Sequence, residues 1–154
     1  MIKKCFNLLL ISIFVISLSG CSQLKENANT DIKNNIEKSD DGEYSIMKIM
    51  INNEEYIINL ENNETVKELI GLLPLELDMN ELNGNEKYAY LDNVLPTNPS
   101  SVKHINSGDV MLYGNNCIVI FYKSFDTTYS YTKIGHIDNL PDLGFGNIKV
   151  KIFK

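Results

Sequence analysis

Five aromatic residues in the second half of the chain are of a type that can hold a ligand: Tyr88, Tyr113, Phe125, Tyr129 and Tyr131. A tyrosine joins an apolar ring to a polar hydroxyl, which suits the wall of a half-hydrated cleft for a peptide or a flat small molecule. The last three lie in or next to the polar segment 124–131, a connection between strands, where loops commonly carry binding residues. Tyrosine also favours strands and fills the faces of sheets. The sequence therefore leaves open whether each ring binds a ligand or packs.

Other reactive side chains give weaker signals. The thiol of Cys117 is a candidate nucleophile if a histidine approaches it, but its Ile, Val and Phe neighbours predict a buried, inert group. His104 and His136 lack the short spacing of metal ligands, so we expect two surface or edge histidines and no metal, cofactor or catalytic residue. Glu86 and Lys87 either form a polar site at the mouth of the barrel or lie in an exposed turn with a weak ion pair.

The N-terminus has the layout of a secretory signal, with a short basic start and an apolar run over residues 5–18. Leu18-Ser19-Gly20-Cys21 resembles the lipobox of bacterial lipoproteins. That resemblance implies a signal peptide over residues 1–20, cleavage before Cys21, and acylation of its thiol and new amino group. An uncleaved membrane helix is the alternative, but the apolar run is shorter than the roughly 20 residues that cross a bilayer.

A lipid on Cys21 implies that the membrane is a partner and that the protein works on the extracytoplasmic face of the cell membrane. In a double-membrane bacterium, Ser22 in place of an aspartate would permit passage to the outer membrane. Residues 22–43 are polar and charged and cannot bury enough apolar surface to fold alone. We therefore expect residues 21–43 to form the lipidated cysteine and its tether, and residues 44–154 to form one domain.

Composition excludes several classes of function. The formal net charge is −6, and no basic patch is dense enough for the footprint of a nucleic-acid-binding protein. Of the three cysteines, Cys5 leaves with the signal and Cys21 carries lipid, so no disulfide within the chain can form with Cys117. An exported domain without disulfides must be held by its hydrophobic core. We expect a monomer.

The elements that must position these side chains are mostly strands. Residues 46–51 and 56–60 are short apolar runs around an Asn pair, which predicts a β-hairpin. Apolar residues recur at helical spacing over residues 66–73 and predict one helix. Either Asn63 or Thr65 can cap its start.

Alternating or continuous apolar runs predict further strands at residues 75–79, 88–90, 110–113, 117–122, 131–137 and 148–152. Because residues 110–113 and 117–122 are nearly all apolar, both faces of these two strands must be covered. Two prolines in residues 95–101 predict a loop without ladder pairing. About seven or eight strands with one or two short helices predict an all-β protein with a closed or nearly closed barrel.

Several ordered blocks of this sequence resemble a bacterial cyclophilin-like domain family. They are residues 83–88 (NGNEKY), 95–99 (LPTNP), 108–114 (GDVMLYG), 121–125 (FYKSF) and 129–135 (YSYTKIG). The likeness covers residues 48–153 and implies a closed eight-stranded cyclophilin-like β-barrel. Domains of this family occur alone, behind lipoprotein signals or linked to flavodoxin-like proteins, and the family as a whole has no established reaction.

The resemblance also raises the question of peptidyl-prolyl cis-trans isomerisation. True cyclophilins polarise the prolyl amide with an arginine inside an apolar pocket that includes tryptophan. All 14 basic residues of this chain are lysines, and it has no tryptophan. A lysine cannot reproduce the planar guanidinium fork. We therefore expect a module that binds a peptide, a protein or a small ligand; the alternatives are a prolyl isomerase and, from the family's associations, an accessory of a flavin-linked redox system.

Overall fold

The computed structural model describes residues 45–154, so the predicted signal peptide, Cys21 and the tether lie outside the described residues. The long strands are β1 (Ile46–Ile51), β2 (Glu54–Leu60), β3 (Leu75–Leu82), β4 (Glu86–Tyr90), β7 (Asp109–Tyr113), β8 (Cys117–Phe121), β10 (Ser130–Ile137) and β11 (Ile148–Phe153). Two-residue strands lie in the connections: β5 (Ser100–Ser101), β6 (His104–Ile105) and β9 (Phe125–Asp126). The helix α1 spans Glu64–Gly71. No helix within residues 45–154 has the length and apolar character needed to cross a bilayer.

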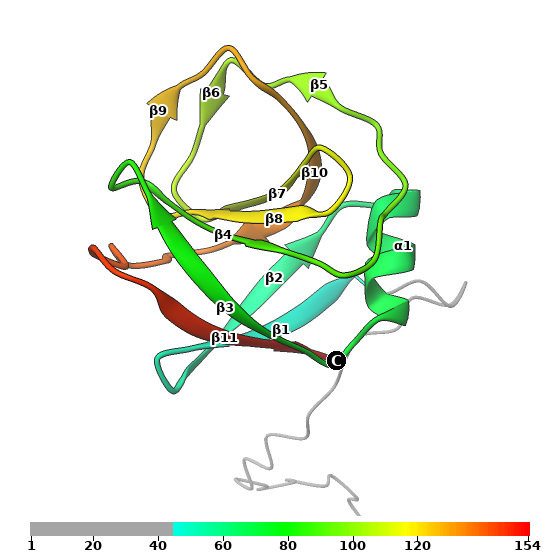
Figure 1. Cartoon of the computed structure of the whole chain (residues 1–154), viewed down its shortest axis with the longest axis horizontal. Coiled ribbons are helices and arrows are strands. Elements are labelled where there is room, and N and C mark those ends of the chain that lie inside the picture. Colours follow the sequence, from blue (N-terminus) through cyan, green and yellow to red (C-terminus); the bar gives the residue numbers. More distant parts are fainter. Residues whose placement is uncertain (1–44) are drawn as a thin grey trace, which may run out of the picture. The chain divides into compact units, whose positions relative to one another are not determined.

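The long strands form one antiparallel barrel (Figure 1). They follow the order β2-β1-β11-β3-β4-β8-β7-β10, and β10 pairs with β2 to close the ring. The prediction of an all-β, eight-stranded cyclophilin-like barrel is confirmed. The prediction that residues 95–101 make no ladder is wrong for the last two, because β5 pairs with β10 beyond the second proline.

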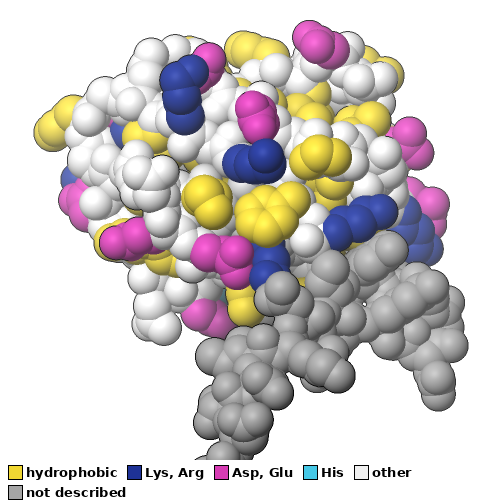
Figure 2. All heavy atoms as spheres, turned by 90° about the horizontal axis from the view of Figure 1, so that it is seen from below, with side chains coloured by type: hydrophobic (Ala, Val, Ile, Leu, Met, Phe, Trp, Pro, Cys, Tyr) yellow, Lys and Arg dark blue, Asp and Glu magenta, His cyan; other side chains and the backbone are white. Residues whose placement is uncertain are grey.

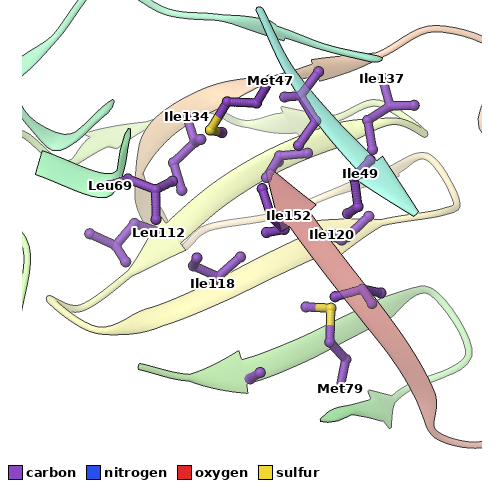
Figure 3. Close-up of a cluster of buried hydrophobic side chains, with 14 of the residues drawn as sticks. Met47, Ile49, Leu69, Met79, Leu112, Ile118, Ile120, Ile134, Ile137 and Ile152 are labelled. Carbon is purple, nitrogen blue, oxygen red and sulfur yellow. The ribbon is translucent and has the colours of Figure 1, made fainter. Parts of the chain in front are cut away.

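The barrel interior is filled by aliphatic side chains that point toward one another from opposite strands (Figure 3). The inward residues Ile49, Ile118 and Ile152 are each at most 1% exposed. Helix α1 adds Leu69 to this core and is capped by Asn63, whose side-chain oxygen accepts a hydrogen bond from the backbone N–H of Val66 at 2.9 Å. Of the two N-cap candidates, Asn63 and Thr65, the structure therefore selects Asn63.

Strand β8 has a buried residue at every position, as its uninterrupted apolar sequence predicts. Ile118 and Ile120 point into the barrel core. Cys117, Val119 and Phe121 point to the outer side, where they form a second buried cluster with side chains that include Met111 and Tyr131. The prediction that both faces of this strand are covered is therefore confirmed, and the second cluster is what supports the candidate site.

Lys87 on β4 is fully buried, so the interpretation of residues 86 and 87 as an exposed turn is wrong. Its Nζ donates to the carbonyl oxygens of Gly144 at 2.6 Å and Gly146 at 2.7 Å, and lies 4.9 Å from the centroid of the Tyr122 ring. Burial lowers the pKa of this ammonium group. The lysine therefore ties the connection before β11 to the barrel wall.

On the outer surface, some of the charged side chains form ion pairs between neighbouring strands. Lys149 lies 2.6 Å from Asp78, and Lys151 lies 3.0 Å from Glu76, which links β11 to β3. Figure 2 shows one face of the molecule on which lysines, acidic residues and apolar side chains are interspersed. Exposed pairs of this kind add little stability, at most about 1 kcal/mol each.

Candidate functional site

The floor of the candidate site is the outer face of three neighbouring strands, β4, β8 and β7. Successive side chains of a strand point to opposite faces, so Glu86, Tyr88 and Tyr90 share the outer face of β4. The ladder places Tyr90 and Tyr113 on either side of Cys117. The rings of Tyr88 and Tyr90 meet at 83° with centroids 6.0 Å apart.

The roof is the segment that contains β9 and leads into β10. Strand β9 pairs with β6 in a small separate sheet, and Figure 1 shows these two strands away from the closed barrel, above β7 and β8. Roof and floor touch through aromatic rings. Tyr113 on β7 lies 6.0 Å from Tyr129 and 5.6 Å from Tyr131, and Phe121 on β8 lies 5.7 Å from Phe125, all between ring centroids.

Between floor and roof lies a cavity of about 590 Å³. That volume is in the usual range for small-molecule sites, roughly 300–1,000 Å³. All five aromatic residues that the sequence singles out line it; the other lining residues are Leu82, Asn83, Asn85, Glu86, Tyr90, Cys117, Val119, Asp126, Thr127 and Thr128. Of the two interpretations of residues 86 and 87, a polar site therefore holds for Glu86, which lines the cavity. Tyr90 was not among the five predicted ligand-binding residues, although its alternation with Tyr88 along a strand is a signal for it.

The five predicted residues differ in how accessible they are. Tyr129 is 60% exposed and Tyr113 is 46% exposed, so both rings can meet a ligand at the rim. Tyr131 is 6% exposed and Phe125 packs against the second buried cluster, so these two rings also stabilise the fold. Tyr88 is half-buried, so its accessibility lies between that of the two rim tyrosines and that of Tyr131.

Glu86 is the charged group at the base of the cavity. It is half-buried, and burial, followed by repulsion from Glu81, raises the pKa of its carboxyl group. Burial and then the Glu86 carboxylate raise the pKa of Cys117 to about 11 and that of Tyr131 to about 12. No residue in the described part of the chain forms an ion pair or a hydrogen bond with the Glu86 carboxylate, and none of the lining residues is a lysine or a histidine.

Comparison with known proteins adds one finding. A family model described as the cyclophilin-like family matches residues 49–152, which covers β2 to β10 completely, the second half of β1 and all of β11 except its last residue. The chain belongs to the cyclophilin-like family. No curated protein and no solved structure matches it.

The other polar candidates in this cyclophilin-like chain have ordinary structural partners. His104 lies 2.7 Å from Asp126, and His136 lies 3.0 Å from Asp109, measured from Nδ1 to a carboxylate oxygen. Both histidines are therefore satisfied, as predicted. Cys117 is 5% exposed, which agrees with the prediction of a buried thiol. Across residues 45–154, no group of three or more His, Cys, Asp or Glu side chains is placed to hold a metal ion.

Proposed function

We propose that this cyclophilin-like protein is a ligand-binding module held on the outer face of the cell membrane by lipid on Cys21. The observation that carries the binding function is the convergence of aromatic residues from strands β4, β7 and β10 and from the β9 segment on one cavity. Tyrosine rings with accessible hydroxyls supply apolar contact area and hydrogen bonds together, as ligand pockets require. The signal-like N-terminus supports the location.

Prolyl isomerisation is the alternative function, and the lining residues do not favour it. No guanidinium group is available anywhere in the chain to polarise a prolyl amide. The charged groups on the cavity wall are the carboxylates of Glu86 and Asp126, which accept hydrogen bonds and do not donate them when ionised. The residues that line the cavity therefore favour ligand binding over prolyl isomerisation.

The test uses the full chain in a maltoside detergent and ligand-observed NMR. The probes are phenol, indole, choline and a short proline-containing peptide, each measured with the wild type, with Tyr129→Ala and with Phe145→Ala. Phe145 is 84% exposed and lies outside the cavity, so it controls for the loss of an exposed ring.

We expect at least one probe to bind the wild type and the Phe145→Ala variant but to bind Tyr129→Ala more weakly. If no probe distinguishes Tyr129→Ala from the wild type, the proposed binding function is wrong. In the same samples, exchange between the cis and trans forms of the peptide at a rate far above that in buffer would replace binding with isomerisation as the function.

A further inference from the structure

We propose that the ligand of this cavity is a small organic cation that carries a quaternary ammonium group. This inference rests on the proposed binding function and names the chemical class of its ligand. It is carried by the geometry of the tyrosine rings and by one carboxylate that has no cationic partner.

The tyrosine rings are arranged in corners. Tyr88 and Tyr90 meet edge to face at 83°, and Tyr113 and Tyr129 do so at 85°, so the two ring planes of each pair are nearly perpendicular and form a corner beside the contact. The face of an aromatic ring is negative, and it attracts a cation that lies within about 6 Å of the ring centre. A corner of two rings lets one cation contact two faces. Quaternary ammonium groups bind in aromatic cages of this kind.

The negative charge on the cavity wall also favours a cationic ligand. Glu86 has no ion pair among residues 45–154, whereas Asp126 at the rim is already 2.7 Å from His104. The lysine nearest along the chain, Lys87, points to the opposite face of β4 and is held by Gly144 and Gly146. The negative potential of Glu86 is therefore not compensated by a lysine or histidine on the cavity wall.

Other ligand classes fit less well. An anion would meet the Glu86 carboxylate on a protein with a net charge of −6. A metal ion needs several close ligands, and no set of three or more such side chains exists in residues 45–154. A primary ammonium group is strongly hydrated and loses more on entering an aromatic wall than a quaternary one does. The apolar surface of Leu82 and Val119 gives room for the methyl groups and the organic body of the ligand.

The experiment measures the dissociation constants of three probes for the full chain in a maltoside detergent, which has no choline headgroup. The probes are choline, its uncharged isostere with a tert-butyl group in place of the trimethylammonium group, and n-butylammonium, which stands for a lysine side chain. We expect choline to bind about tenfold more tightly than the isostere, since a difference of about 1.4 kcal/mol corresponds to that factor. We expect n-butylammonium to bind more weakly than choline.

Two variants and one control test the residues. Glu86→Gln should reduce the ratio of choline affinity to isostere affinity to about threefold or less. Tyr129→Leu keeps an apolar side chain but removes a ring face, so it should weaken choline binding more than isostere binding; Tyr129 is 60% exposed, which makes this variant safe for folding. Glu68→Gln makes the same chemical change as Glu86→Gln on the exposed face of α1 and should leave the ratio unchanged.

The outcomes separate this inference from the proposed function. Equal affinities for choline and its isostere, both weakened by Tyr129→Leu, would overturn the cationic ligand and leave the cavity as a binding site. Tighter binding of n-butylammonium than of choline would also overturn the quaternary assignment. Failure of every probe, charged or neutral, to respond to Tyr129→Leu would overturn both.

Discussion

The ring of Tyr129 meets the ring of Tyr113 edge-on, with centroids 6.0 Å apart and ring planes at 85°. Tyr129 belongs to the roof segment and Tyr113 to strand β7 of the floor, so this contact joins the two sides of the cavity. Both rings are about half-exposed, at 60% and 46%. Neither ring therefore carries much of the burial energy of the barrel, and both remain accessible to the ligand that we propose.

Replacing Tyr129 with alanine should weaken ligand binding and leave the fold almost intact. The aromatic pair contributes about 0.5–1.5 kcal/mol beyond area burial, and the half-exposed ring buries little area, so we expect the unfolding free energy to fall by no more than about 1.5 kcal/mol. Phe125→Ala should behave differently, because Phe125 packs on Phe121 in the second buried cluster and should lose about 2 kcal/mol or more. Urea unfolding of both variants checks this; a larger loss for Tyr129→Ala would assign its ring to the core.

Binding of a cation should depend on the ionisation of Glu86. Burial raises the pKa of Glu86 above the usual glutamate value, and only the ionised carboxylate attracts a cation. Affinity should therefore be highest above this pKa and fall as the pH drops through it. The carboxylate of Glu81 on β3 also repels that of Glu86. Cys117 and Tyr131 face the same cavity, but they stay neutral over this acidic to neutral range because their pKa values are about 11 and 12.

The raised pKa of Glu86 affects folding stability in the opposite direction: cation binding weakens at low pH, whereas the contribution of Glu86 to stability is greatest there. Since the folded protein holds the proton of Glu86 more tightly than the unfolded chain, this residue's contribution to stability is fully present below the unfolded pKa. It is lost as the pH rises through the folded pKa. Titration of choline binding and of the urea midpoint from acidic to neutral pH should show both trends, and Glu86→Gln should remove the part due to Glu86. An unchanged acid profile in that variant would show that Glu86 is not the titrating group.

The thiol of Cys117 should react slowly in the native protein. Its pKa is about 11, raised first by burial and then by the Glu86 carboxylate, so the reactive thiolate is scarce at pH 8. We expect iodoacetamide to label Cys117 far faster in urea than in buffer. Glu86→Gln should accelerate native labelling only modestly, because burial is the larger cause. Rapid native labelling would show that the base of the cavity opens to solvent.

The features of this fold that can be predicted from the sequence are those that depend on residues close together in the chain. Alternating and continuous apolar runs are local, and they identify the hairpin, helix α1 and the two-sided strand β8 without knowledge of the fold. The barrel closure between β2 and β10 joins residues far apart in sequence, such as Ile58 and Ile137. No local pattern determines that pairing: the number of short strands and the family resemblance both predicted a closed barrel, but neither identified the residues that pair.

The candidate site could be predicted only in part, because its residues come together from distant parts of the chain. The aromatic character of Tyr113 and Tyr129 is visible in the sequence, but their convergence depends on how the roof segment crosses β7. The sequence leaves open whether Glu86 and Lys87 form a polar site or an exposed charged pair. Strand alternation sends Glu86 to the cavity and Lys87 to a buried position against Gly144 and Gly146. The environment of a charged side chain depends on the face of the strand, which a two-residue pattern does not reveal.

Lipidation at Cys21 is a separate prediction from the N-terminal sequence. Two or more acyl chains give stable anchoring, since each buried CH₂ contributes about 0.8 kcal/mol. In cells fed an alkyne-labelled fatty acid, we expect the wild type to take up label and to sediment with membranes. Cys21→Ser should lose the label, whereas Cys117→Ser should retain it and serves as the matched control. Labelling of the Cys21→Ser variant would contradict the assignment.

Closure of the barrel should depend on Gly135, where β10 pairs with β2 and leaves no room for a side chain. A Cβ atom on this residue would lie 2.3 Å from the carbonyl oxygen of Asn59 and 2.9 Å from Cγ2 of Ile58, so alanine forces the two strands apart. We expect Gly135→Ala to lower the unfolding free energy by about 3 kcal/mol or more in urea titrations. Gly71→Ala is the control, because nothing lies within 4 Å of its Cβ position at the end of α1 and its φ is not positive; it should be neutral or slightly stabilising.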